Sequence, residues 1–355
     1  MASLLHSSVQ FDRLMEGKEP VIRTKSNWIG LLLVAATGLC PAGEAGKRPA
    51  AVSTGRPAVL WEDPADIASR DLFYGSGGKQ DAPPAGAYTF LKEDLEGTNP
   101  KFDVRDRSGV KWKVKLGIEA RPETTASRLV WAAGYFTNED YFVPELRVEG
   151  LPARLHRGQK LVGPGGTFHN VRLKREEKGE KKAGNWAWRQ NPFVGSRQLN
   201  GLKAMMALVN NWDLKDVNNA IYPDGSKLIY MVSDLGASFG APGRSWPASR
   251  SKDNWNSYSR SKFIRRETSE AVDFETPARP RWMLIVNPKE YFMRVHLEWI
   301  GRNVPRDDAR WMGKLLSRLS PRQIEDAFRA GGYSTQETAE FSRLLSSRIA
   351  TLNDL

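Results

Sequence analysis

A short segment near the middle of the chain carries polar residues suited to phosphoryl transfer. Asp213 and Asn218 share one loop, and Asp234 follows a predicted hairpin that turns at Asp224-Gly225. Transfer of a phosphoryl group requires a carboxylate that orients the acceptor hydroxyl and oxygen ligands for the magnesium that accompanies the phosphates. A loop followed by a hairpin would bring these side chains together. We therefore predict that Asp213 is catalytic and that Asn218 and Asp234 bind metal.

The same loop offers a second catalytic candidate and also a simpler interpretation. Lys215 lies two positions after Asp213 and is the second candidate. A helix-ending cap with an Asx turn would explain Asp213 and Asn218 without any catalysis, so that alternative stays open.

Predicted strands and helices surround this loop. Three short strands are expected at 88–92, 101–106 and 110–116, and in the third the lysines alternate with apolar residues at the period of a strand. A helix is expected from Pro122 to Ala133, with Gly134 ending it. Later helical patterns are expected at 196–209, 311–319, 321–330 and 335–352.

The central segment resembles the catalytic loop of protein kinases, where Asp-Leu-x-x-x-Asn precedes a hairpin and a metal-binding Asp-x-Gly. Here the corresponding stretches are 213–218 and 234–236. Because Asn211-Trp212 replaces His-Arg, and neither a G-x-G-x-x-G loop nor Ala-Pro-Glu is present, the chain is more similar to atypical kinase-like families. These are the CotH spore-coat kinases, HipA-type kinases and exported secretory-pathway kinases. The resemblance covers roughly residues 85–245 and rests on 211–213, 218–219 and 234–240.

This resemblance implies an α+β, two-lobed protein-kinase-like fold with a small β-rich N-lobe and a larger, mainly helical C-lobe. It also implies that Lys115 contacts the α- and β-phosphates of ATP and that Glu123 orients Lys115. Lys113 shares the strand face with Lys115 and could take its place, and Glu119 competes with Glu123. ATP with Mg²⁺ or Mn²⁺ is the implied cofactor.

The turn between the first two strands is a separate candidate. In place of a glycine-rich loop, Gly97 and its neighbours could offer backbone N–H groups to phosphate. A plain tight turn is the other interpretation.

Composition excludes several kinds of site. The 355 residues include a single cysteine, Cys40, which rules out an internal disulfide, a thiolate zinc cluster and an iron–sulfur centre. The net charge of +12 favours anionic partners, including an anionic envelope polymer. Without C2H2 or RNP-like motifs, no specific nucleic-acid partner is expected. The basic residues that follow Asp234, among them Lys252, are either an acceptor-binding run or a solvated face.

The beginning of the chain suggests export. Residues 29–39 are an uncharged apolar run, too short to span a bilayer, with basic residues before it and Pro41, Gly43 and Ala45 after it. We predict a signal peptide at 1–45, a linker at 46–60, an N-lobe at 61–184 and a C-lobe at 185–355. The Gly-rich, charged stretch 156–184 is expected to be an exposed insertion. A buried N-terminal helix is the alternative to the signal peptide.

The predicted function is an ATP-dependent phosphotransferase that acts outside the cytoplasm, in the periplasm or cell envelope, on an unknown hydroxyl-bearing protein, sugar or lipid. Two alternatives remain open from the sequence. One is an AMP-transferring enzyme on the same fold, and the other is a non-catalytic kinase-like envelope module that binds anionic glycan or lipid.

Overall fold

The computed structural model describes residues 55–97, 99–176, 181–241, 251–275 and 282–355. All of them belong to one unit, Pro49–Leu355. The predicted signal peptide, Cys40 and most of the predicted linker lie outside these residues. Strands dominate the first part of the described chain and helices the last part, so the fold is α+β. The two-lobe layout stays a prediction.

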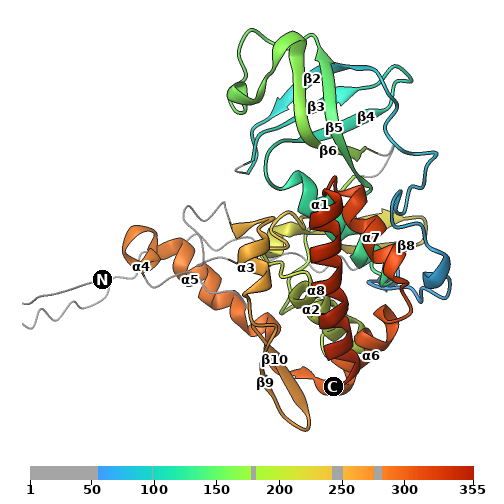
Figure 1. The fold of residues 1–355 in the computed structure, drawn as a ribbon, viewed down its shortest axis with the longest axis vertical. Coiled ribbons are helices and arrows are strands. Elements are labelled where there is room, and N and C mark those ends of the chain that lie inside the picture. Colours follow the sequence, from blue (N-terminus) through green and yellow to red (C-terminus); the bar gives the residue numbers. More distant parts are fainter. Residues whose placement is uncertain (1–54, 98, 177–180, 242–250, 276–281) are drawn as a thin grey trace, which may run out of the picture. The chain divides into compact units, whose positions relative to one another are not determined.

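Five strands form a closed barrel in the order β2-β3-β4-β6-β5, with β2 and β5 pairing in parallel (Figure 1). The three predicted strands are present as β2, β3 and β4. The alternation predicted for β4 is also present, because Trp112 and Val114 are buried in the barrel core together with residues such as Phe102 and Phe168. The strands are β2 (Ala87–Asp94), β3 (Lys101–Arg105), β4 (Lys111–Lys115), β5 (Asp140–Glu149) and β6 (Thr167–Arg175).

The prediction of an exposed insertion at 156–184 is wrong for β6, which pairs with both β4 and β5 inside the barrel. Phe168, Val171 and Leu173 are completely buried. The alternation is broken between Phe168 and Val171 because Asn170 has a left-handed backbone with φ of 53°. The high charge and the interrupted alternation explain why the sequence did not indicate this strand. Its basic residues face away from the barrel core.

Helix α1 (Ala120–Ala132) follows β4 and begins two residues before the predicted Pro122. Gly134, with φ of 89°, ends it as predicted. The face with Ala126, Leu129 and Val130 packs into the core that also contains residues of α2 and of the C-terminal helices. The helix therefore links the end of β4 to that core.

A three-stranded sheet, β1-β8-β7, carries the predicted hairpin: β7 (Asn219–Asp224) and β8 (Lys227–Val232) pair antiparallel. β1 (Ala58–Val59) pairs in parallel with β8, so the end of the predicted linker is part of the folded sheet. The next residue, Leu60, is buried in the helical core. A strand of two residues leaves no periodic signal, which explains why the sequence indicated a linker.

Three predicted helices are present as α2 (Arg197–Leu208), α7 (Pro321–Ala330) and α8 (Thr335–Asn353). The helix predicted at 311–319 is present as α6 (Arg306–Leu316), which begins five residues earlier and ends three residues earlier than predicted. α8 packs against both α6 and α7 (Figure 1). Capping boxes at Ser320 and Ser334 fix where α7 and α8 begin. The other α-helices and strands of the described residues are α3 (Trp255–Ser259), α4 (Met283–Val286), α5 (Pro288–Leu297) and the sheet of β9 (Ile264–Glu267), β10 (Ala271–Phe274) and β11 (Val304–Pro305).

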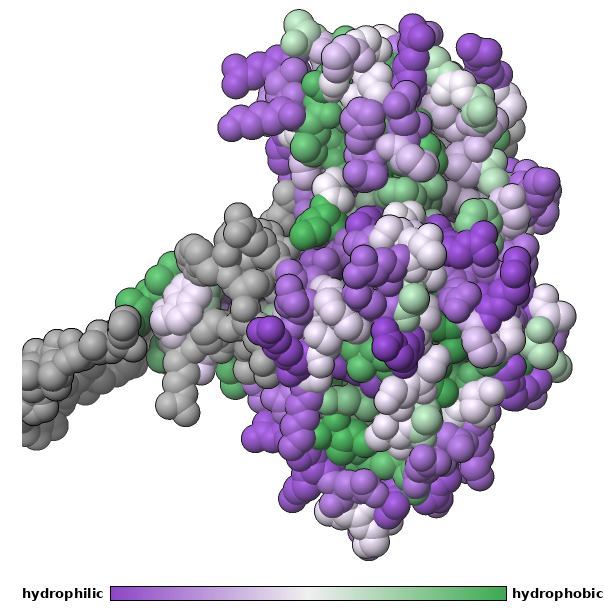
Figure 2. All heavy atoms as spheres, viewed as in Figure 1, coloured by the Kyte–Doolittle hydropathy of each residue, from purple (hydrophilic) through white to green (hydrophobic). Residues whose placement is uncertain are grey.

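The face of the described residues that Figure 2 shows is mainly polar. In the view of Figure 2, hydrophilic residues dominate and hydrophobic ones are scattered among them. None of the helices in the described ranges is both long and apolar enough to cross a membrane.

Candidate functional site

The loop between α2 and β7 lies against the segment that follows β8. Backbone hydrogen bonds join Ser233 N to Asn218 O at 2.9 Å, and Phe239 N to Val209 O at 2.8 Å. A third bond, at 3.4 Å, joins Trp212 N to Ala237 O. The two segments predicted to carry the catalytic and metal-binding residues are therefore adjacent.

Asp213 is held by two cations. Its Oδ1 atom accepts a hydrogen bond of 2.6 Å from Nη1 of Arg294 and lies 3.2 Å from Nζ of Lys215. The carboxylate stays 17% exposed. The Asx-type turn in this loop is made by Asn211, which accepts from the backbone N–H of Asp213, whereas the Asp213 carboxylate contacts the side chains of Arg294 and Lys215.

Asn218 is oriented by the same loop. Its Nδ2 donates to the backbone carbonyl of Asp213 at 2.7 Å. Because the nitrogen is used in this way, the amide oxygen is the atom left for a further partner, and no described residue contacts it. An amide oxygen is a suitable ligand for magnesium.

Lys115, at the end of β4, contacts three carboxylates. Its Nζ lies 2.7 Å from Glu119, 2.8 Å from Glu123 and 3.2 Å from Oδ1 of Asp234. Lys115 is only 3% exposed, whereas the side chain of Asp234 is 39% exposed. The structure thus joins the end of a barrel strand, the start of α1 and the segment after β8 at one ammonium group. Glu119 and Glu123, the two residues considered as the partner of Lys115, therefore both contact it.

The carboxylates differ in electrostatic environment. Burial would raise the pKa of Glu119, but the ammonium groups of Lys115 and Lys252 outweigh it and hold the pKa below the ordinary value. Burial raises the pKa of Glu123 to about 7, and the opposing effect of Arg172 and Lys115 does not cancel this. Burial would lower the pKa of Lys115, but Asp234 and the two glutamates raise it well above its ordinary value. Lys115 therefore stays charged in the folded chain.

Lys113 does not contact this cluster. Its Nζ lies 2.8 Å from Asp94 and 3.7 Å from Asp103. It lines a cavity of about 520 Å³, together with residues that include Lys174, Tyr222 and Met231. Asn138, which also lines the cavity, donates to the carbonyl of Ser233, so the cavity adjoins the Asp234 segment.

Among the described residues, Gly97 forms no hydrogen bond with Lys115 or its three carboxylates, although Lys101, in the strand that follows the turn, is the register partner of Lys115. Gly97 has φ of 66° in the turn between β2 and β3, and its carbonyl accepts a hydrogen bond from Arg157 at 2.5 Å. Arg157 also donates to the carbonyl oxygens of Asp94 and Glu96. These contacts engage carbonyl oxygens of the turn, so phosphate binding by its backbone N–H groups stays a prediction beside the plain tight turn.

Three cations lie close to the site: Arg172 and Arg294, which were not predicted as site residues, and Lys252, which was predicted only within an acceptor-binding run or a solvated face. Arg172 pairs with Glu123 and Asp140, Lys252 pairs with Glu119, and Arg294 bonds Asp213. Arg172 is the register partner of Lys115 across β4 and β6. This contact could have been predicted from the sequence only if β6 had been recognised as a strand. Lys252 and Arg294 lie far along the chain from their partners, and nothing in the local sequence indicates those contacts.

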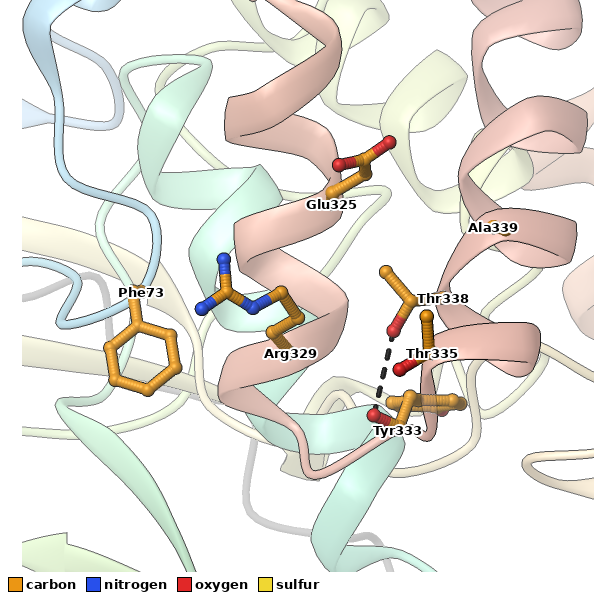
Figure 3. A pocket seen from close by; sticks show the side chains of 7 residues that line it. All are labelled: Phe73, Glu325, Arg329, Tyr333, Thr335, Thr338 and Ala339. Carbon is orange, nitrogen blue, oxygen red and sulfur yellow. Dashed lines mark hydrogen bonds between the residues drawn. The ribbon is translucent and has the colours of Figure 1, made fainter.

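A second cavity, of about 440 Å³, contains none of the candidate residues. It is lined by Phe73 and by residues of α7, α8 and the turn between them, including Arg329 and Tyr333 (Figure 3). It is therefore not part of the candidate site.

The comparisons with known proteins give weak similarities. No protein-family model and no curated protein matches the chain. Among solved structures, the proinflammatory kinase CtkA of Helicobacter pylori has 9% identity and a TM-score of 0.42, covering 76% of this chain and 98% of CtkA. The Golgi casein kinase has 9% identity and a TM-score of 0.36, covering 83% of this chain and 76% of that one.

Proposed function

We propose that this chain is an ATP-dependent phosphotransferase of protein-kinase-like fold that acts on a hydroxyl group. The observation that supports this most is the ammonium of Lys115, which contacts Glu123 and Asp234 although Asp234 lies 119 residues further along the chain. A buried lysine among carboxylates from separate elements is suited to hold phosphates opposite a metal-binding aspartate.

The donor set fits a magnesium ion. Oδ1 of Asp234 is used by Lys115 and by the backbone N–H of Gly236, and Oδ2 has no partner among the described residues. That oxygen and the amide oxygen of Asn218 are hard donors of the kind magnesium prefers. When bound, the ion would neutralise charge on the phosphates.

Electrostatics favour a metal-bound nucleotide over a free one. Glu119, Glu123 and Asp234 place carboxylate oxygens within 4.8 Å of one another. Asp140 is a fourth carboxylate nearby, because Arg172 pairs with both Glu123 and Asp140. These four carboxylates outnumber the three cations of the described residues that pair with them, Lys115, Arg172 and Lys252, so the cluster would attract an unaccompanied triphosphate poorly.

Asp213 would act on the acceptor. Its Oδ1 is held by Arg294 and Lys215, and its partly exposed carboxylate can accept a hydrogen bond from the acceptor hydroxyl. As the acceptor oxygen bonds to the γ-phosphorus and the bond to ADP breaks, Asp213 takes up the hydroxyl proton. We assign the base of the nucleotide to the cavity lined by Lys113, Tyr222 and Met231, which adjoins the Asp234 segment.

The test is a thermal-shift measurement of the full chain with ATP and Mg²⁺. Nucleotide at about 100 times its Kd should stabilise the chain by about 2.7 kcal/mol. Asp234→Asn should lose this stabilisation, while the matched variant Asp307→Asn, at a position 83% exposed on α6, should keep it. ATP without a divalent cation should have little effect. Equal stabilisation by Mg²⁺-ATP of the unchanged chain, Asp234→Asn and Asp307→Asn would contradict the proposed site.

The location and the type of group transferred are further parts of the proposal. Action outside the cytoplasm is supported only by the sequence of residues 1–45, and cell fractionation would test it. Mass spectrometry of the labelled product would distinguish transfer of phosphate from transfer of AMP.

A further inference from the structure

Helix α5 supplies a buried arginine to the catalytic loop. Arg294 lies 81 residues after Asp213, and its side chain is only 6% exposed. Nη1 donates to Oδ1 of Asp213 at 2.6 Å and to the backbone carbonyl of Trp212 at 3.2 Å. One guanidinium group therefore contacts both the candidate catalytic carboxylate and the backbone beside it.

The arginine is itself held in place. Its Nε donates to Glu290, one turn earlier on α5, at 2.8 Å. Its guanidinium carbon lies 4.8 Å from the centroid of the Trp212 ring, within the range of a cation–π interaction. Asn287 and Pro288 fix the start of the same helix. A planar guanidinium with contacts on several sides loses less freedom on binding a carboxylate than a mobile surface lysine would.

The contact has a directional effect on Asp213. Both cations, Arg294 and Lys215, approach the same oxygen, Oδ1. Among the described residues, none contacts Oδ2. The geometry therefore directs Oδ2, the other oxygen, to an incoming hydroxyl group.

We propose that Arg294 is a positioning residue for Asp213, which fixes the orientation of the carboxylate so that Oδ2 meets the acceptor. This inference rests on the proposed phosphotransferase function. Arg294 acts through Asp213 and does not contact the nucleotide. Its loss should therefore change turnover and leave nucleotide binding intact.

The experiment measures steady-state turnover of Mg²⁺-ATP by the full chain, as phosphate released to water or transferred to the chain itself. Arg294→Gln should lower kcat about 10- to 100-fold, because a displaced catalytic group costs that much. KM for ATP and the ATP-dependent thermal shift should stay as in the unchanged chain. Arg294→Lys keeps the positive charge and should recover part of kcat.

Lys289→Gln is the matched control, since it removes a cation from an exposed position of the same helix. It should leave both constants unchanged. An Arg294→Gln protein with unchanged or higher kcat would overturn the inference, and so would a rise in KM with kcat preserved. If Arg294→Gln does not fold, Arg294→Lys decides: full kcat would overturn the inference, and lower kcat at constant KM would support it.

The same experiment separates this inference from the proposed function. If the unchanged chain neither turns over ATP nor is stabilised by Mg²⁺-ATP, the proposed function fails and the role of Arg294 fails with it. If the unchanged chain is active and the Arg294 variants match it, only the role of Arg294 is wrong.

Discussion

Asp213 is the residue on which the proposed chemistry depends most directly. Asp213→Asn keeps the size of the side chain but cannot accept a proton, so we expect kcat to fall by about 10² to 10⁴. The ATP-dependent thermal shift should remain, because Asp213 is not among the residues around Lys115. Turnover and thermal shift measured on the same preparation check this. Unchanged turnover would remove Asp213 from the mechanism.

Glu119 and Glu123 both contact Lys115, but their pKa values shift in opposite directions. The lowered pKa of Glu119 contributes stability that is complete above its ordinary value of 4.5 and is lost as pH falls below it. The raised pKa of Glu123 means that the folded state binds more protons between 4.5 and about 7. Through Glu123, stability therefore decreases as pH rises across that window.

Urea unfolding as a function of pH tests this difference with two isosteric variants. Glu119→Gln should cost about 3–5 kcal/mol at pH 7, because it leaves buried cations without their partner, and the cost should shrink below pH 4.5. The cost of Glu123→Gln should instead shrink as pH rises from 4.5 to 7. The same pH trend for both variants would contradict the opposite pKa shifts of Glu119 and Glu123.

At the scale of elements, an aromatic cluster joins the Asp234 segment to the C-terminal helices. The fully buried ring of Phe239 lies 5.6 Å from Tyr258, 5.1 Å from Phe328 and 6.1 Å from Phe341, measured between centroids. The backbone of Phe239 bonds both Val209 and Asn254. The residues after Asp234 therefore depend on α3, α7 and α8 for their position.

Phe239→Ala should lower the free energy of unfolding by about 3–5 kcal/mol, because it leaves a cavity in this cluster. Phe292→Ala makes the same change on α5 at a position 60% exposed, and should stay within about 0.5 kcal/mol. Urea denaturation of both proteins gives the comparison. Similar losses for the two would show that Phe239 is not packed as described.

For the whole molecule, the structure differs from the sequence prediction at the boundary between the linker and the folded chain. β1 extends the β7–β8 hairpin, and Leu60 is 2% exposed in the core shared with the helices. The folded part therefore begins before Trp61, where the sequence predicted it to begin.

Leu60→Ala should cost about 2–5 kcal/mol in unfolding free energy, as expected for a buried leucine. Leu95→Ala, at a position 56% exposed, should cost less than about 0.5 kcal/mol. If Leu60→Ala matched Leu95→Ala in a denaturant titration, residues 58–60 would be linker after all.

The sequence by itself determined the local elements and the candidate residues of the site. Strand-forming segments between turn signals located β2, β3 and β4, and apolar stripes at helical spacing located α7 and α8, because these signals lie within a few residues of one another. The spacing of Asp213, Asn218 and Asp234 around a hairpin likewise identified them as candidates for a single site.

The tertiary structure decided which distant groups meet. It brought Glu119 as well as Glu123 to Lys115, separated Lys113 from that cluster, and placed Arg294 on Asp213. It also placed β1 in a sheet and β6 in a barrel. Such contacts arise from pairing and burial between segments far apart in the chain, and neither local propensity nor spacing carries information about which buried charge will face which partner.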